Sequence, residues 1–254
     1  MSVDRRDPVG TSARTLLVRA PPVRFVFVLP LLLLGCTAES RLAQAPGTQT
    51  VPSDASVAAE TRYLALGDSF TAGTGATLQT SFPARLTAKW ASAGRAVTLE
   101  NVAVNGYTTG KLIDVELPAL ASFSPTFVTL AIGANDIVHG STEAAYRAAL
   151  QSIFAAIASA SVPLANVVAL PQPDWSRSPV AGSFGDRATL AASIATFNAA
   201  LADEAKRAGA RYVDLTPTMN AQIDAGHIAP DGLHPSAEAY DAWAAALMSA
   251  LAAQ

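Results

Sequence analysis

The chain has 254 residues, half of them hydrophobic, which is enough for one domain of ordinary size plus an extension. The first 35 residues hold five arginines and two aspartates, so the remainder has 12 basic and 18 acidic residues, a net charge of −6. This acidic balance argues against nucleic-acid binding, which needs a basic face. The sequence has no repeat with a period of 20–50 residues, which argues against a solenoid.

Residues 1–35 have the pattern of a secretory signal peptide. Arginines precede the apolar run Phe25–Gly35, which is interrupted by Pro30 and is too short to span a bilayer. The run ends in "LLGC", which resembles the lipobox of bacterial lipoproteins. That resemblance implies cleavage before Cys36, diacylglycerol on its sulfur and a membrane anchor. An ordinary signal peptide with an incidental cysteine is the alternative, and the long basic leader leaves open a start codon further along.

The segment that follows the cysteine predicts a flexible tether. Residues 37–60 are polar and small and contain proline. The residue after Cys36 is Thr37 and not an aspartate. This resembles the pattern of lipoproteins sorted to the outer membrane, if the host is Gram-negative. Cys36 is the single cysteine of the chain, so no intrachain disulfide can form. We expect one folded domain over residues 61–254.

Within this domain, short apolar runs alternate with amphipathic stretches of helical length. Runs that are apolar throughout are typical of strands covered on both faces. The alternation therefore predicts a five-stranded parallel sheet in a three-layer α/β/α sandwich of the flavodoxin-like type. The expected strands are 62–66, 97–103, 126–133, 165–170 and 210–215, and the expected helices are 82–94, 109–121, 142–160, 187–208 and 236–251.

Residues of types that take part in catalysis follow four of these strands. Ligands of such folds bind beyond the carboxyl ends of the strands, where these residues would gather. A serine hydroxyl needs a base within hydrogen-bond reach, and histidine can accept and return a proton near neutral pH. An aspartate three residues before the histidine can reach its other ring nitrogen. The residues concerned are Ser69, Gly106, Asn135, Asp231 and His234.

Four motifs at these positions resemble the GDSL, or SGNH, hydrolase family over about residues 61–251. They are "GDSFTAG", "NVAVNGYTT", "GAND" and "DGLHPS", in the family's order. The resemblance implies a serine esterase or lipase without a cofactor. It makes Ser69 the nucleophile, His234 the base and Asp231 the acid that orients it. It assigns the oxyanion to the N–H groups of Ser69 and Gly106 and to the side-chain amide of Asn135.

Two positions depart from the family pattern, and several residues have simpler explanations. Ala103 stands where many members carry glycine, and Tyr107, where a small or acidic residue is common, could alter the shape of the site. Ser69 and Asn135 could each cap a helix, and Gly106 could be a turn glycine. A metal at Asp231 and His234 is not expected, because His139 and His227, the other histidines, lack a matching spacing.

Two loop features bear on the substrate pocket. Trp175 follows the fourth strand and either lines the pocket or packs within its loop. The segment 178–187 is polar and contains glycine, and a mobile flap is one interpretation. Trp90 and Trp243 fall in expected helices and are expected in the core.

The sequence as a whole predicts an exported serine esterase of the cell envelope that forms an acyl-enzyme on Ser69. One alternative is a carbohydrate or peptidoglycan O-acetyl esterase of the same family. Another is a non-catalytic surface lipoprotein that keeps the fold for binding. Acyl chain length, the alcohol portion of the substrate and oligomeric state are not predicted.

Overall fold

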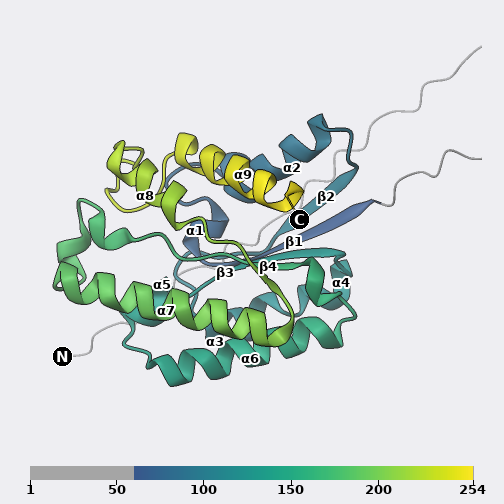
Figure 1. Ribbon diagram of the computed structural model, residues 1–254, viewed down its shortest axis with the longest axis horizontal. Helices are drawn as coiled ribbons and strands as arrows, with labels where there is room; N and C mark the ends of the chain where they lie inside the picture. Colours follow the sequence, from purple (N-terminus) through teal and green to yellow (C-terminus); the bar gives the residue numbers. More distant parts are fainter. Residues whose placement is uncertain (1–59, 254) are drawn as a thin grey trace, which may run out of the picture. The chain divides into compact units, whose positions relative to one another are not determined.

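The structure is a computed structural model that describes residues 60–253, and its sheet has the expected architecture. All five strands are parallel, in the order β2-β1-β3-β4-β5 (Figure 1). This is the flavodoxin-like order, which reverses direction between β1 and β3. The α/β/α fold class is therefore confirmed, and the reversal marks where a ligand is expected.

The strands are shorter than the apolar runs that predicted them, apart from the first. The elements are β1 (Thr61–Gly67), α1 (Ser69–Ala72), η1 (Leu78–Thr80), α2 (Phe82–Ser92), β2 (Val97–Asn101), α3 (Thr109–Lys111), η2 (Leu112–Glu116), α4 (Ala119–Phe123), β3 (Phe127–Ala131), α5 (Ala134–Val138), α6 (Glu143–Ser159), η3 (Leu164–Asn166), β4 (Val167–Ala169), η4 (Trp175–Arg177), η5 (Ala181–Ser183), α7 (Arg187–Ala208), β5 (Arg211–Tyr212), α8 (Thr216–Asp224) and α9 (Ala237–Ala252).

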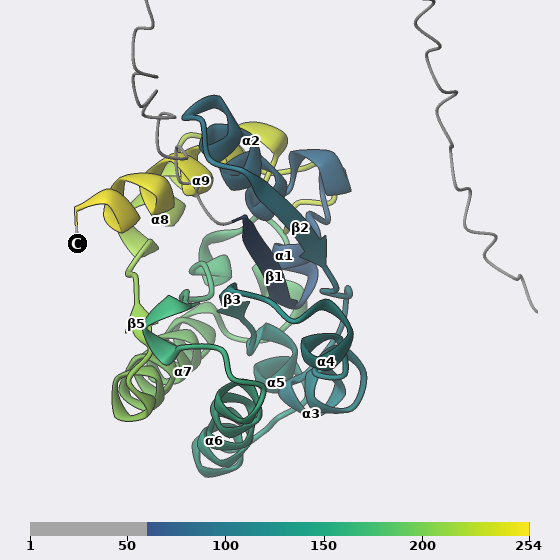
Figure 2. The same cartoon turned by 90° about the vertical axis from the view of Figure 1, so that its right-hand side faces the viewer.

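The two faces of the sheet bury separate cores because successive side chains of a strand point to opposite faces. Tyr63 and Ala65 of β1 pack in the core under α2, α8 and α9, which also holds Trp90 and Trp243, as expected. Leu64 and Leu66 pack in the core under α6 and α7. Figures 1 and 2 show these two helix layers on opposite sides of the sheet. Each buried large apolar side chain contributes about 1.5–3 kcal/mol.

The expected helix over 109–121 is the largest local departure from the sequence prediction. It divides into α3, the π-helical turn η2 and α4. The N–H of Leu117 donates to the carbonyl of Leu112 at 3.1 Å, a bond across five residues. Pro118 has no N–H to continue the ladder. The short helices α5 and α8 lie outside the expected helix ranges, since neither is long enough to show a clear period.

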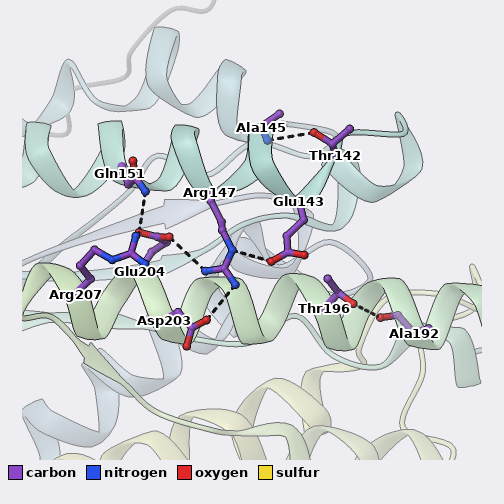
Figure 3. Close-up of polar contacts among 10 residues, drawn as sticks. All are labelled: Thr142, Glu143, Ala145, Arg147, Gln151, Ala192, Thr196, Asp203, Glu204 and Arg207. Carbon is purple, nitrogen blue, oxygen red and sulfur yellow. Dashed lines mark hydrogen bonds and ion pairs between the residues drawn. The ribbon is translucent and has the colours of Figure 1, made fainter.

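The helices α6 and α7 are joined by a polar network around Glu204 (Figure 3). The Glu204 carboxylate accepts hydrogen bonds from Arg147 Nη1 at 3.3 Å, Gln151 Nε2 at 3.2 Å and Arg207 Nη1 at 2.5 Å. Arg147 also binds Glu143 and Asp203, at 2.7 and 3.0 Å. Charges of both signs are therefore matched between these two helices.

The predictions for the N-terminal part lie outside the described residues. These are the signal peptide over 1–35, lipidation at Cys36 and the tether over 37–60, of which only Glu60 is described. In residues 60–253, no helix combines the length and apolar character needed to cross a bilayer.

Candidate active site

The strand β1 ends at a glycine because its neighbour β3 leaves no room for a side chain. A Cβ atom on Gly67 would lie 2.3 Å from the carbonyl oxygen of Ala131. The next residue, Asp68, caps α1: its Oδ1 accepts a hydrogen bond from the N–H of Phe70 at 3.1 Å. Ser69 is then the first residue of α1 and is not the cap, so the simpler explanation of this serine is wrong.

The glycine-containing loop after α1 lies against the segment that carries His234. A Cβ atom on Gly75, whose φ is 91°, would lie 2.7 Å from the Cβ of His234. The hydroxyl of Tyr240 on α9 donates to the carbonyl of Thr74 at 2.8 Å. The first and last motifs, far apart in the sequence, therefore meet through this loop.

His234 is oriented by Asp231 within one turn. The Oδ1 atom of Asp231 accepts hydrogen bonds from the N–H groups of Leu233 and His234, at 2.9 and 3.0 Å. Its Oδ2 atom lies 2.7 Å from Nδ1 of His234. Desolvation acts to raise the pKa of Asp231, but these hydrogen bonds outweigh it and lower that pKa below its usual value. An ionised carboxylate at Nδ1 leaves the other ring nitrogen available as a base.

The residues predicted as nucleophile, oxyanion donor and base, Ser69, Asn135 and His234, line one pocket of about 110 Å³. They come from the ends of β1 and β3 and from the loop before α9, at the point where the strand order reverses. Phe70 packs beside His234, with the two ring centroids 5.5 Å apart. Asn105, Val138 and Leu233 also line the pocket and were not singled out from the sequence.

Of the three proposed oxyanion donors, Ser69 and Asn135 line this pocket and Gly106 does not. Asn135 is the second residue of α5, whose N-cap is Gly133, so the capping explanation of this asparagine is wrong. One amide hydrogen of Asn135 is held by the carbonyl of Tyr107 at 3.0 Å. Gly106 has φ 83°, and its neighbour Asn105 lines the pocket. Within residues 60–253, the N–H groups of Ser69 and Gly106 donate to no other protein group.

The structure places the two suggested substrate-binding residues differently. Trp175 is buried, lines the pocket and makes an edge-to-face contact with Phe184, with ring centroids 5.2 Å apart. Tyr107 does not line this pocket, but its carbonyl oxygen accepts a hydrogen bond from the side-chain amide of Asn135.

The segment considered as a flap is held by Arg187. Its guanidinium group donates to the carbonyls of Ser176, Ser178 and Pro179, at 2.6, 2.8 and 3.1 Å. These bonds favour a fixed wall of the pocket.

Two histidines outside the site have partners of their own. Nδ1 of His139 lies 2.6 Å from the carbonyl oxygen of Asn135, and Nδ1 of His227 lies 2.6 Å from Oε1 of Gln222. Over the part of the chain that the structure describes, no group of three or more His, Cys, Asp or Glu side chains could hold a metal ion.

Three buried acids lie behind the site: Asp68, Glu116 and Asp136. Burial raises the pKa of Asp68 to about 7 and that of Glu116 to about 8, and it also raises the pKa of Asp136. Asp136 accepts hydrogen bonds from the N–H and the hydroxyl of Thr109, at 2.9 and 2.6 Å. The sequence analysis missed Glu116. Its position in the sequence could have indicated burial, because Glu116 lies on the same helix face as the apolar residues Leu112 and Leu120, four residues from each.

Comparisons with known proteins bear on the family and the fold of this chain. The sequence profile of the GDSL-like lipase/acylhydrolase family matches residues 65–242. A search of curated proteins found no sequence that matches the chain.

Solved structures with the same fold include three hydrolases. A psychrotrophic esterase from Pseudoalteromonas sp. is 19% identical, with a TM-score of 0.61 over 76% of this chain and 97% of its own. An extracellular lipase from Streptomyces rimosus is 25% identical, with a TM-score of 0.58 over 75% and 99%. An acetyl xylan esterase from Geobacillus stearothermophilus is 17% identical, with a TM-score of 0.62 over 74% and 93%.

Proposed function

The chain belongs to the GDSL-like lipase/acylhydrolase family and is a carboxylic ester hydrolase. From that premise we propose that it is a serine esterase of the cell envelope that forms an acyl-enzyme on Ser69. The observation that carries the proposal is the shared pocket: Ser69, Asn135 and His234 line it together, and Asp231 holds the ring of His234 at 2.7 Å.

Acylation begins when Oγ of Ser69 attacks the ester carbonyl carbon. The proton of the hydroxyl passes to Nε2 of His234, and the imidazolium that forms is stabilised by the carboxylate of Asp231. The carbonyl oxygen becomes an oxyanion and is bound by the N–H groups of Ser69 and Gly106 and by the amide of Asn135. When the C–O bond to the alcohol breaks, the proton moves from His234 to the departing oxygen. The acyl group remains on Ser69.

Deacylation repeats these steps with water as the nucleophile. His234 takes a proton from the water, whose oxygen attacks the acyl carbon, and the same donors bind the second oxyanion. The bond to Oγ of Ser69 then breaks, and the proton returns from His234 to that oxygen. The acid is released and the enzyme is restored without a cofactor.

The size of the pocket supports short acyl groups. Its volume of about 110 Å³ is somewhat less than the 150 Å³ of an apolar cavity that holds benzene. Trp175 and Phe184 form its aromatic wall. This pocket also supports the second candidate, an O-acetyl esterase acting on carbohydrate or peptidoglycan. Hydrolysis of p-nitrophenyl esters from acetate upward, compared with a panel of acetylated sugars, separates the two.

The test of the nucleophile is covalent labelling with a fluorophosphonate probe, which reacts with activated serines. We expect the wild-type protein to be labelled on Ser69, and Ser69→Ala to lose both labelling and ester hydrolysis. Ser178→Ala is a matched control, because Ser178 is also buried but lies outside the pocket lining. A wild-type protein that is folded yet neither labelled nor active would favour the non-catalytic binding protein instead.

The envelope location is proposed from the sequence resemblance at Cys36. Lipidation of this residue would anchor the domain to a membrane, in the outer membrane if the host is Gram-negative. We expect the full-length protein to fractionate with membranes and Cys36→Ala to be released into the soluble fraction. Equal membrane association of the two forms would contradict the anchor.

A further inference from the structure

Glu116 is a buried acid with no basic partner among the described residues. Its side chain projects from η2 on the same side of the sheet as α6 and is 1% exposed. The Oε2 atom accepts a hydrogen bond from the N–H of Gly67 at 2.9 Å, whereas Oε1 has no hydrogen-bond partner in residues 60–253. The acid therefore binds the backbone two residues before Ser69.

Glu116 supplies the acceptor that the sheet itself lacks at this point. The pairing of β1 with β2 ends at Ala65 and Asn101, so Gly67 extends beyond its neighbour. After β2, the N–H of Val102 donates to the carbonyl of Ala65 at 3.2 Å and the N–H of Val104 donates to the carbonyl of Gly67 at 3.4 Å. Neither bond gives the N–H of Gly67 an acceptor. An unpaired backbone N–H in a buried position is costly, and Glu116 satisfies it.

The same contact joins two of the loops that form the oxyanion hole. Gly67 leads into Ser69, and Val104 leads into Gly106. The N–H of Val104 is near enough to Glu116 to lower its pKa, which partly offsets the effect of burial. One carboxyl group thus lies against the backbone of both loops, behind the pocket rather than in it.

We propose that Glu116 is a positioning residue of the esterase: it fixes the end of β1 relative to the 102–107 loop, and thereby the spacing of the Ser69 and Gly106 N–H groups. The inference rests on the proposed function of these two donors. Glu116 does not touch the substrate, so its effect falls on the transition state, in which the oxyanion forms, rather than on substrate binding.

The charge state of Glu116 determines which variant should preserve the site. Burial, together with the negative charge of the facing Asp68, raises the pKa of Glu116 to about 8. The group is therefore largely uncharged at neutral pH, where a glutamine of the same shape can offer an oxygen to the N–H of Gly67. Alanine removes the acceptor altogether.

The test compares kcat, KM and the rate of fluorophosphonate labelling of Ser69 for four variants, with folding checked by circular dichroism. Glu116→Ala should lower kcat and the labelling rate by about 10²-fold, the effect of a small misplacement of catalytic groups, with KM changed less than about 3-fold. Glu116→Gln should retain kcat within about 3-fold. Glu204→Ala and Glu204→Gln are the matched controls, because Glu204 is 2% exposed but lies between α6 and α7 (Figure 3), and they should leave kcat of the folded protein unchanged.

Three outcomes would overturn the inference. The first is a folded Glu116→Ala variant with the kcat and labelling rate of the wild type. The second is loss of kcat in Glu116→Gln equal to that in Glu116→Ala, which would indicate a requirement for charge rather than for an acceptor. The third is a wild-type protein that the probe does not label, which would overturn the proposed function and this inference with it.

Discussion

Glu116 and Glu204 are buried to nearly the same degree, 1% and 2% exposed, but their surroundings differ in kind. Glu204 lies between two arginines and a glutamine, so its carboxylate is matched by positive charge (Figure 3). Glu116 faces a backbone N–H and the acid Asp68. The first arrangement places cationic side chains beside the carboxyl group, and the second raises the pKa of Glu116 and so disfavours its charged form.

This difference indicates that the interface between α6 and α7 and the carboxyl edge of the sheet have different roles. Paired charges between α6 and α7 stabilise the packing of two long helices, and no pocket residue of the proposed site takes part in them. The acids behind the carboxyl edge of the sheet accept hydrogen bonds from the backbone N–H groups of Gly67, Phe70 and Thr109, which lie close in sequence to Ser69 and Gly106. We therefore expect changes at the sheet edge to alter activity, and changes at the helix interface to alter stability.

The largest expected effect is at the base. His234→Ala should lower kcat by at least about 10⁴-fold, because Ser69 then has no group to take its proton. Steady-state ester hydrolysis measures this loss, and thermal unfolding should show a stable fold. His227→Ala is the matched control, since its ring binds Gln222. Unfolding of His234→Ala would contradict the expectation that changes at the sheet edge alter activity without altering stability.

A smaller loss of activity is expected at the oxyanion donor. Asn135→Ala should lower kcat by about 10²–10³-fold, with a modest change in KM, because a donor to the oxyanion is lost. The same substitution frees the carbonyl of Tyr107, which Asn135 now binds at 3.0 Å. Single-turnover acylation kinetics report the effect directly. An unchanged acylation rate would remove Asn135 from the oxyanion hole.

The helix interface should respond in the opposite way. Glu204→Ala should lower the free energy of unfolding by about 1–3 kcal/mol, since it leaves Arg207 without its partner and Arg147 with only its more exposed ones. That corresponds to a fall in Tm of roughly 2–12 °C for a domain of this size. Calorimetry and kcat, measured together, check it. A fall in kcat without a fall in Tm would contradict the expectation that this helix interface affects stability and not activity.

An effect of similar size, confined to a range of pH, is expected in the pH dependence of stability. Burial raises the pKa of Glu116 from 4.5 to about 8 and that of Asp68 from 3.8 to about 7. A group whose pKa rises on folding stabilises the protein fully below its ordinary pKa, and that stabilisation is lost as pH rises through the raised value. The free energy of unfolding should therefore fall between about pH 4.5 and 8.

Glu116→Gln should flatten that fall by roughly 1–3 kcal/mol over the same range, because glutamine does not titrate. Chemical denaturation at several pH values measures the slope for both proteins. Parallel curves would show that Glu116 is ionised to the same extent in the folded and unfolded states, contrary to the uncharged acid expected here.

Local pattern was sufficient to predict most of the fold. The apolar runs that became β1 and β3 and the long helices α6, α7 and α9 were placed within one or two residues, because period and burial are read from neighbouring side chains. The break of the helix over 109–121 was not predicted. A π-helical turn leaves no mark in the hydrophobic pattern beyond the acid at position 116.

The sequence by itself determined the long helices and the five strands, the order of the motifs and the residue types that hydrolyse an ester. Only the tertiary structure decided which groups meet: that Gly75 makes room for His234, that Asn135 binds the backbone at Tyr107, and that Glu116 accepts from Gly67. The reason is physical. Periodicity arises from residues a few positions apart, whereas a site is formed by contacts across tens to more than a hundred residues, and these depend on how both layers of helices pack on the sheet.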